Sequence, residues 1–188
     1  ITHDEQLLRE YPDKTRKSIF GGCWVEEASY SIHPKSKDLS MVYSGKQQLT
    51  GHRLRHEIAN EGIENLSLFG KGSKTPIEKK EQALVDYRYS IVIENTKQPN
   101  YFTEKLLDCF ATGTIPVYYG CPNITEYFNA DGIITFDSKK ELLEILPSLT
   151  TETYESKAQA IEENFKIFTD YAVTEDWLYC NILQDYDR

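Results

Sequence analysis

Residues 89–120, YSIVIENTKQPNYFTEKLLDCFATGTIPVYYG, decide the fold of this chain. Their β-branched run at residues 90–93 is typical of a strand that is buried on both faces. The run stops at the polar pair Glu94-Asn95, and the composition of residues 96–100 favours a turn. The stretch therefore begins with a buried strand that leads into a polar loop.

A helix with one apolar face is predicted after this loop. Thr103 is placed to cap its start, and Gly113 suits its end. Apolar residues recur at helical spacing, at Leu106, Leu107, Phe110 and Ala111, whereas Glu104, Lys105 and Asp108 stay off this stripe. Residues 115–119, IPVYY, have the composition of a second strand, so the whole unit is strand, loop, helix, strand.

The rest of the chain repeats this alternation. Further strands are predicted at residues 39–44, 66–69 and 132–136. Residues 18–24 are predicted to be a short strand followed by a tight turn at Gly21-Gly22. Further helices are predicted at residues 3–10, 51–61, 76–87, 138–147 and 152–169, and from residue 174 onward. Alternating strands and helices predict an α/β fold, with a Rossmann-like parallel sheet covered by helices on both faces.

The composition excludes several classes of protein. The chain of 188 residues suits one domain, and its net charge of -9 disfavours a nucleic-acid-binding protein. No apolar run approaches the roughly 20 residues that a membrane-spanning helix needs. The four cysteines form no C-x-x-C pair, so neither a zinc site nor a redox motif is indicated, and a reducing, cytoplasmic location is expected.

Polar residues gather where the central strand ends and the helix begins, because these two ends share one edge of a parallel sheet. The helix start and the Lys105 charge suit a diphosphate, and the Glu104 carboxylate can accept from both hydroxyls of a ribose. Each residue also has an ordinary structural explanation: Glu104 complements the helix dipole, Lys105 is solvated, and Asn95 serves the turn.

Three other motifs could indicate a phosphate-binding loop or a metal site, but each fits its pattern poorly. GKGSKT at residues 70–75 departs from both the Walker loop and the dinucleotide fingerprint. The Asp-x-Asp triplet at residues 185–187 lies at the C-terminus, where a metal site is not expected, so no metal is predicted. His52 and His56 have the spacing of a zinc pair, but an exposed helix edge is favoured.

An ordered set of motifs runs through the central unit: Glu94-Asn95, Tyr101-x-Thr103-Glu104-Lys105-Leu106, GTIPV at residues 113–117, and Gly120. This set closely resembles the signature of the family-10 glycosyltransferases, the α1,3/4-fucosyltransferases. The resemblance is specific over residues 86–136 and weaker from about residue 40 onward. It implies the C-terminal, GDP-fucose-binding half of a two-domain GT-B enzyme.

The resemblance also implies a reaction: inverting transfer of fucose from GDP-fucose to a glycan hydroxyl, without a metal or other cofactor. Lys105 and an arginine would neutralise the departing GDP. Arg55 is the better match, because Ile58 then falls on the family's apolar position, and Arg53 stays open. The remaining site residues would contact the donor: Glu104 the ribose, Tyr101 and Thr103 the nucleotide, and Glu94 and Asn95 either the loop or the fucose.

In the resembled family, the catalytic base is a carboxylate of the N-terminal, acceptor-binding domain. Residues 1–188 are therefore expected to be a single donor domain, with residues 1–38 as a lead-in from that domain and the base outside this chain. The Golgi lumen would be the location if the parent is a eukaryotic membrane-anchored enzyme. The alternative function is a nucleotide-sugar-binding module without turnover. The sequence does not define the acceptor glycan or the oligomeric state.

Overall fold

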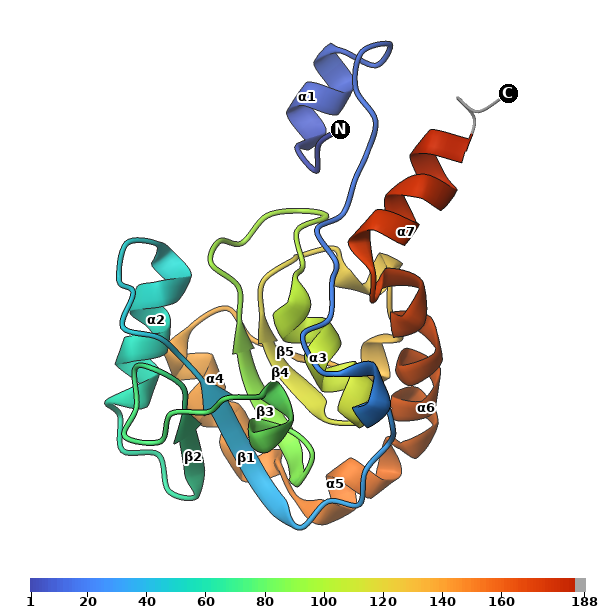
Figure 1. The fold of residues 1–188 in the computed structure, drawn as a ribbon. Coiled ribbons are helices and arrows are strands. Elements are labelled where there is room, and N and C mark those ends of the chain that lie inside the picture. The colour runs from blue at the N-terminus through green and yellow to red at the C-terminus, as the bar shows by residue number, and fades with distance from the viewer. Residues whose placement is uncertain (185–188) are drawn as a thin grey trace.

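A five-stranded parallel sheet forms the centre of the computed structural model, which describes residues 1–184 (Figure 1). The strand order is β2-β1-β3-β4-β5, and every neighbouring pair is parallel. The strands are β1 (Lys37–Val42), β2 (Leu66–Phe69), β3 (Tyr87–Ile93), β4 (Ile115–Tyr119) and β5 (Ile134–Thr135). The predicted α/β fold with a Rossmann-like sheet is confirmed.

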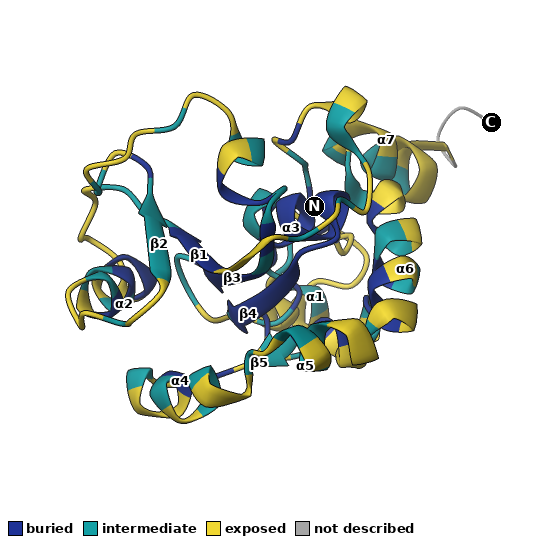
Figure 2. Cartoon of the chain, turned by 90° about the horizontal axis from the view of Figure 1, so that it is seen from below, coloured by how far each residue is buried: buried dark blue, intermediate teal, exposed yellow. Residues whose placement is uncertain are grey.

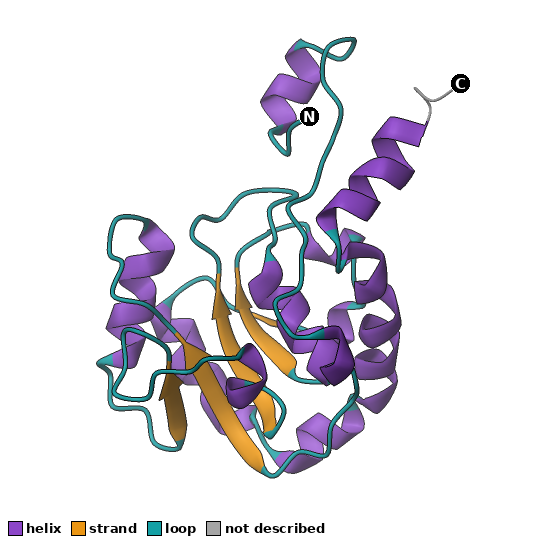
Figure 3. Ribbon diagram, in the orientation of Figure 1, coloured by secondary structure: helices purple, strands orange, loops and turns teal. Residues whose placement is uncertain are grey.

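Helices cover both faces of this sheet (Figure 3). The α-helices within residues 1–184 are α1 (Glu5–Glu10), α2 (Thr50–Ala59), α3 (Glu104–Thr112), α4 (Lys139–Ile145), α5 (Thr151–Ser156), α6 (Ala158–Ile167) and α7 (Thr174–Leu178). Of these, α1 and α7 lie beyond one edge of the sheet and not on its faces (Figure 1). α3 and α6 pack against each other on one face, and α2 and α4 lie together on the other. None of the helices within residues 1–184 is long and apolar enough to cross a membrane.

The central strand β3 is buried on both faces, as its β-branched run predicts (Figure 2). Val92 points to one side and packs in a core with Leu106 and Phe110 of α3. Ile91 points to the other side and packs in a second core with Ile58 of α2. Because alternate residues of a strand face opposite sides, β3 joins the two cores.

The ends of α3 also follow the prediction. Thr103 is the N-cap, and its Oγ1 accepts from the backbone N of Lys105 at 3.5 Å. Gly113 has φ of 70°, a left-handed conformation that glycine adopts without a Cβ clash. Asn100 has φ of 60°, which fits the turn predicted before the helix.

Two predicted elements are wrong. The strand predicted within residues 18–24 is instead a lead-in with a single bridge, Gly21 to Thr103. The turn predicted at Gly21-Gly22 is present, with φ of 49° and 83°, values that strands do not use. Residues 76–87 are not one helix. Only Lys80–Ala83 form a 3-10 turn, and β3 already begins at Tyr87, which pairs with Lys37.

Smaller corrections concern the helices and the histidines. The helix predicted at residues 152–169 is divided into α5 and α6 at Lys157. His52 is buried, so it does not belong to an exposed helix edge with His56. Its Nδ1 lies 3.3 Å from the backbone N of Leu49, where it accepts at the start of α2. The Asp-x-Asp triplet at residues 185–187 lies outside the described residues.

Candidate functional site

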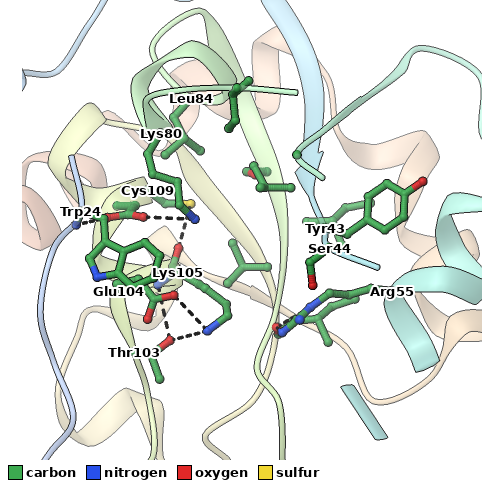
Figure 4. A pocket seen from close by; sticks show the side chains of 18 of the residues that line it. Trp24, Tyr43, Ser44, Arg55, Lys80, Leu84, Thr103, Glu104, Lys105 and Cys109 are labelled. Atoms are coloured by element: carbon green, nitrogen blue, oxygen red, sulfur yellow. Dashed lines mark hydrogen bonds and ion pairs between the residues drawn. The ribbon is translucent and has the colours of Figure 1, made fainter. Parts of the chain in front are cut away.

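A cleft with a volume of about 700 Å³ opens at the carboxyl ends of β1 and β3. The strand order reverses between these two strands, and open α/β sheets bind their ligands at such a point. The cleft is lined by the loop after β1, the inner face of α2, the start of α3 and the segment of residues 77–81 (Figure 4). α1 and α7 extend beyond this same edge of the sheet (Figure 1).

Lys105 is the cation on the α3 side of the cleft. Its Nζ donates to Thr103 Oγ1 at 2.8 Å and to Glu94 Oε2 at 3.3 Å, and it pairs with Glu104 Oε1 at 3.2 Å. Burial lowers the pKa of Lys105, but the two carboxylates outweigh this effect and the net shift is upward. The ammonium is therefore charged at neutral pH, and its side chain stays 22% exposed to the cleft.

Glu94 ties the end of β3 to the start of α3. Its carboxylate is fully buried and accepts from the backbone N of Thr103 at 2.8 Å, in addition to the Thr103 hydroxyl and Lys105. Burial raises the pKa of Glu94, while Lys105 and Thr103 oppose the rise. Glu94 does not line the cleft. Of the two roles left open by the sequence, ordering the loop fits this position.

Arg55 is the cation on the α2 side of the cleft. Its guanidinium donates to the Ile93 carbonyl through Nε at 3.0 Å and through a terminal nitrogen, which also donates to Asn95 Oδ1 at 3.0 Å. Figure 4 shows Arg55 and Lys105 pointing into the same space from opposite sides. Burial lowers the pKa of Arg55, although a guanidinium stays charged in proteins. Two positive groups thus face one cleft.

Gly51 lets α2 approach close enough for Arg55 to reach the end of β3. A Cβ on Gly51 would lie 1.8 Å from the Glu94 carbonyl oxygen. Gly51→Ala is therefore expected to displace α2 and to lower the free energy of unfolding by about 1–3 kcal/mol, as overpacking does. Urea unfolding measures this loss. Gly45→Ala is the matched control, because no atom lies within 4 Å of its Cβ position, and equal stability of the two variants would contradict the prediction.

The structure brings most of the predicted site residues together. The cleft is lined by Arg55, Asn95, Tyr101, Thr103, Glu104 and Lys105. Tyr101 packs edge-to-face on Phe20 of the lead-in, with 5.1 Å between the ring centroids. Arg53 is exposed and does not line the cleft, so of the two candidates only Arg55 is placed at it.

Sequence reasoning missed a second end of the cleft, where Trp24, Lys80, Glu81 and Asp108 lie. Asp108 is off the apolar stripe of α3 as predicted, yet it is 1% exposed. Its Oδ1 accepts from the backbone N of Trp24 at 2.6 Å and of Val25 at 3.2 Å. The only signal in the sequence was the position of Asp108 one helical turn after Glu104, on the face that begins at the cleft.

The arrangement suits a ligand that carries both an anionic group and hydroxyl groups. The start of α3 contributes partial positive charge, and Lys105 and Arg55 add two full charges. Glu104 lies beside them with a side chain that is 15% exposed. Two cations are chemically suited to a diphosphate, and the Glu104 carboxylate is suited to a pair of hydroxyl groups.

Comparison with known proteins gives a consistent assignment. The family model for glycosyltransferase family 10 (fucosyltransferase), C-terminal part, matches residues 32–186. The chain is 30% identical over 70 residues to the alpha-(1,3)-fucosyltransferase FucT of Helicobacter pylori, which is 37% of this chain and 15% of that protein. It is 26% identical over 113 residues to the alpha-(1,4)-fucosyltransferase of Arabidopsis thaliana, which is 56% of this chain and 28% of that protein.

Solved structures agree in fold. A crystal structure of alpha1,3-fucosyltransferase with GDP-fucose matches with a TM-score of 0.56 at 23% identity, over 73% of this chain and 46% of the other. A structure described without a ligand matches with a TM-score of 0.55 at 21% identity, over 76% and 49%. The matches thus cover about half of the solved chains and less than a third of those two curated relatives. Because the family model covers well over half of the sequence, this chain belongs to glycosyltransferase family 10, the fucosyltransferases, and corresponds to their C-terminal part.

Proposed function

We propose that this chain is the donor domain of a fucosyltransferase, which binds GDP-fucose for inverting, metal-independent transfer of fucose to a glycan hydroxyl. The observation that carries the proposal is the pair of cations, Lys105 and Arg55, at the start of α3 and across the cleft from it. The family supports the choice of nucleotide sugar, since a fucosyltransferase solved with GDP-fucose shares this fold.

Binding of the donor is expected to replace an ion pair that is present in the cleft. Lys105 now pairs with Glu104 at 3.2 Å. In the proposed complex, the diphosphate takes the place of Glu104 on the ammonium, and the released carboxylate accepts from the ribose hydroxyls. Asn95 and Tyr101 line the cleft beside these groups and complete the donor site.

The two cations also lower the barrier to transfer. When the bond between fucose and GDP breaks, negative charge grows on the terminal phosphate of GDP. Lys105 and Arg55 are already held in place by Thr103, Glu94 and the Ile93 carbonyl, so they stabilise this charge without reorganising. Inversion follows from attack of the acceptor hydroxyl on the face of the sugar opposite to GDP.

Binding of GDP and GDP-fucose is expected to be independent of divalent ions, because the protein's own cations neutralise the diphosphate. Isothermal calorimetry with GDP, GDP-fucose and UDP, in chelator and in magnesium or manganese, measures this. The affinities for the guanine nucleotides should agree in all three buffers. Loss of binding in chelator would contradict metal independence, and failure of GDP to bind in any buffer would contradict the donor-site assignment.

The alternative is a nucleotide-sugar-binding module without turnover, which is favoured by the placement of the carboxylates. Among the carboxylates on the α3 side of the cleft, Glu104 is paired with Lys105 and Asp108 is buried. Neither is free to act as the base that deprotonates the acceptor hydroxyl. Both functions require the same donor site, so calorimetry tests what they share and a transfer assay separates them.

A further inference from the structure

Two buried oxygens at one end of the cleft lack a hydrogen-bond partner. They are Asp108 Oδ2 and Glu81 Oε2, and within residues 1–184 no other buried side-chain nitrogen or oxygen is left unpaired. Both residues line the cleft. Buried acceptors without a partner are uncommon, because each costs free energy that a hydrogen bond would recover. This end of the cleft is therefore arranged for a ligand that donates hydrogen bonds.

Both carboxylates are held in fixed positions by the same segment of the lead-in. Asp108 uses its other oxygen to accept from the backbone N of Trp24 and of Val25. Glu81 uses its other oxygen to accept from the backbone N of Glu26 at 2.6 Å. Residues 24–26 therefore anchor one oxygen of each group, and both oxygens without a hydrogen-bond partner belong to residues that line the same cleft.

One cation and one aromatic ring complete this end of the cleft. Lys80 Nζ is 3.8 Å from Asp108 Oδ2, too far for a hydrogen bond, and lies 5.3 Å from the centroid of the Trp24 ring. The Trp24 residue is 66% exposed, and Figure 4 shows its ring beside Lys80 at the cleft. The polar groups thus offer one donor and two acceptors, next to an aromatic surface on which a planar ring can stack.

The position along α3 shows which part of the ligand reaches these groups. Lys105 and Glu104 at the helix start take the diphosphate and the ribose in the proposed function. Asp108 lies one turn further along the helix, on the same face as Glu104. In a nucleoside diphosphate, the base follows the ribose. The base is therefore the part that meets Asp108, Glu81 and Lys80.

Guanine is the base whose edge matches one donor and two acceptors. Its O6 accepts, and its N1–H and 2-amino group donate. Adenine has a single hydrogen-bond donor on that edge, its 6-amino group, and uracil also has a single donor, N3–H, whereas guanine has two. We propose that Asp108 and Glu81 select guanine: their two oxygens without a partner accept from its N1–H and 2-amino groups, and Lys80 donates to its O6. This assignment rests on the proposed function, because the diphosphate and ribose positions orient the base.

The charge state of Asp108 agrees with this role. Burial raises the pKa of Asp108 from 3.8 to about 6, while Lys80 opposes the rise. The other titratable groups around it are Glu81, Glu104, Cys23 and Cys109. At pH 7.5 the carboxylate is ionised and accepts. Below about pH 6 it gains a proton, and its capacity to accept a hydrogen bond from guanine is reduced.

The test is calorimetry of GDP, IDP and ADP with the native chain and with Asp108→Asn. Asparagine keeps an oxygen for the Trp24 and Val25 backbone, but it places an amide donor against the guanine donors. We expect Asp108→Asn to weaken GDP binding by about 10- to 100-fold at pH 7.5, the loss of one charged hydrogen bond, and to leave ADP binding unchanged. IDP, which lacks the 2-amino group, should bind the native chain more weakly than GDP.

Controls keep the outcomes distinct. Asp13→Asn removes the same charge from an exposed position, and it should bind all three nucleotides as the native chain does. GDP binding by the native chain should also weaken between pH 7.5 and 5.5 more than binding by Asp108→Asn, a comparison that cancels titration of the phosphate. Equal weakening of GDP and ADP in Asp108→Asn, or unchanged GDP binding, would overturn the guanine assignment. A native chain that binds none of the nucleotides would overturn the proposed function itself.

Discussion

Replacing Lys105 by alanine is expected to weaken GDP binding by one to two decades and to lower the free energy of unfolding by about 3 kcal/mol. The first effect is the loss of one charged hydrogen bond to the diphosphate. The second arises because Glu94 is fully buried and Lys105 is the cation that contacts it. Without Lys105, a buried carboxylate keeps only its Thr103 contacts and loses its compensating charge.

A second variant separates these two effects. Glu94→Gln in the Lys105→Ala background removes the uncompensated charge, so it should restore most of the stability but none of the GDP affinity. Urea unfolding measures the first quantity and calorimetry the second. If GDP affinity returned together with stability, Lys105 would act only by ordering the end of β3. Unchanged GDP affinity in a folded Lys105→Ala variant would dismiss the diphosphate contact.

The central unit could be predicted because its signals are local. The cap at Thr103, the left-handed Gly113 and the β-branched run of β3 depend on residues within a few positions of one another. The lead-in could not be predicted in the same way. The turn at Gly21-Gly22 was predicted, but the apolar residues before it form no strand, and the lead-in makes a single bridge, from Gly21 to Thr103 at the start of α3.

The choice between Arg53 and Arg55 also follows from helix geometry once Gly51 is placed. Gly51, Arg55 and Ile58 recur at spacings of four and three, so they share one face of α2, and all three are buried. Arg53 lies on another face and is exposed. The sequence shows that these three residues share one face of α2, but not which face points inward. The close contact of Gly51 with the end of β3 shows that it is this face.

The end of the cleft that is proposed to bind guanine depends on contacts between residues far apart in the sequence, which no local sequence pattern reveals. Asp108 accepts from backbone groups at Trp24 and Val25, more than 80 positions earlier in the chain. Glu81 lies in a segment that was predicted to be helical and forms only a 3-10 turn. Such long-range pairs become visible only when the tertiary structure places them together, so the predicted site was limited to the diphosphate and ribose end.

The chain of residues 1–188 is expected to bind GDP-fucose but to transfer fucose at least 10²–10⁴-fold more slowly than a complete fucosyltransferase, roughly the contribution of a general base. Transfer needs a held donor, a positioned acceptor and a base within hydrogen-bond reach of the attacking hydroxyl. None of the three carboxylates nearest the donor site is free for this role. Glu94 is fully buried, and Glu104 is engaged by Lys105 in the structure and by the ribose in the proposed complex. Asp108 faces the guanine ring in the proposed complex.

The assay incubates this chain with labelled GDP-fucose and a mixed panel of glycans, and the Helicobacter pylori alpha-(1,3)-fucosyltransferase serves as the active control. Calorimetry on the same preparation shows that the donor is bound, so a low rate cannot be ascribed to an empty site. Robust transfer by this chain alone would show that the base lies within it. In that case Glu94→Gln is the first variant to measure: a loss of transfer with GDP-fucose binding intact would identify Glu94 as the base, and would require the end of β3 to open during the reaction, because Glu94 is now held by Thr103 and Lys105.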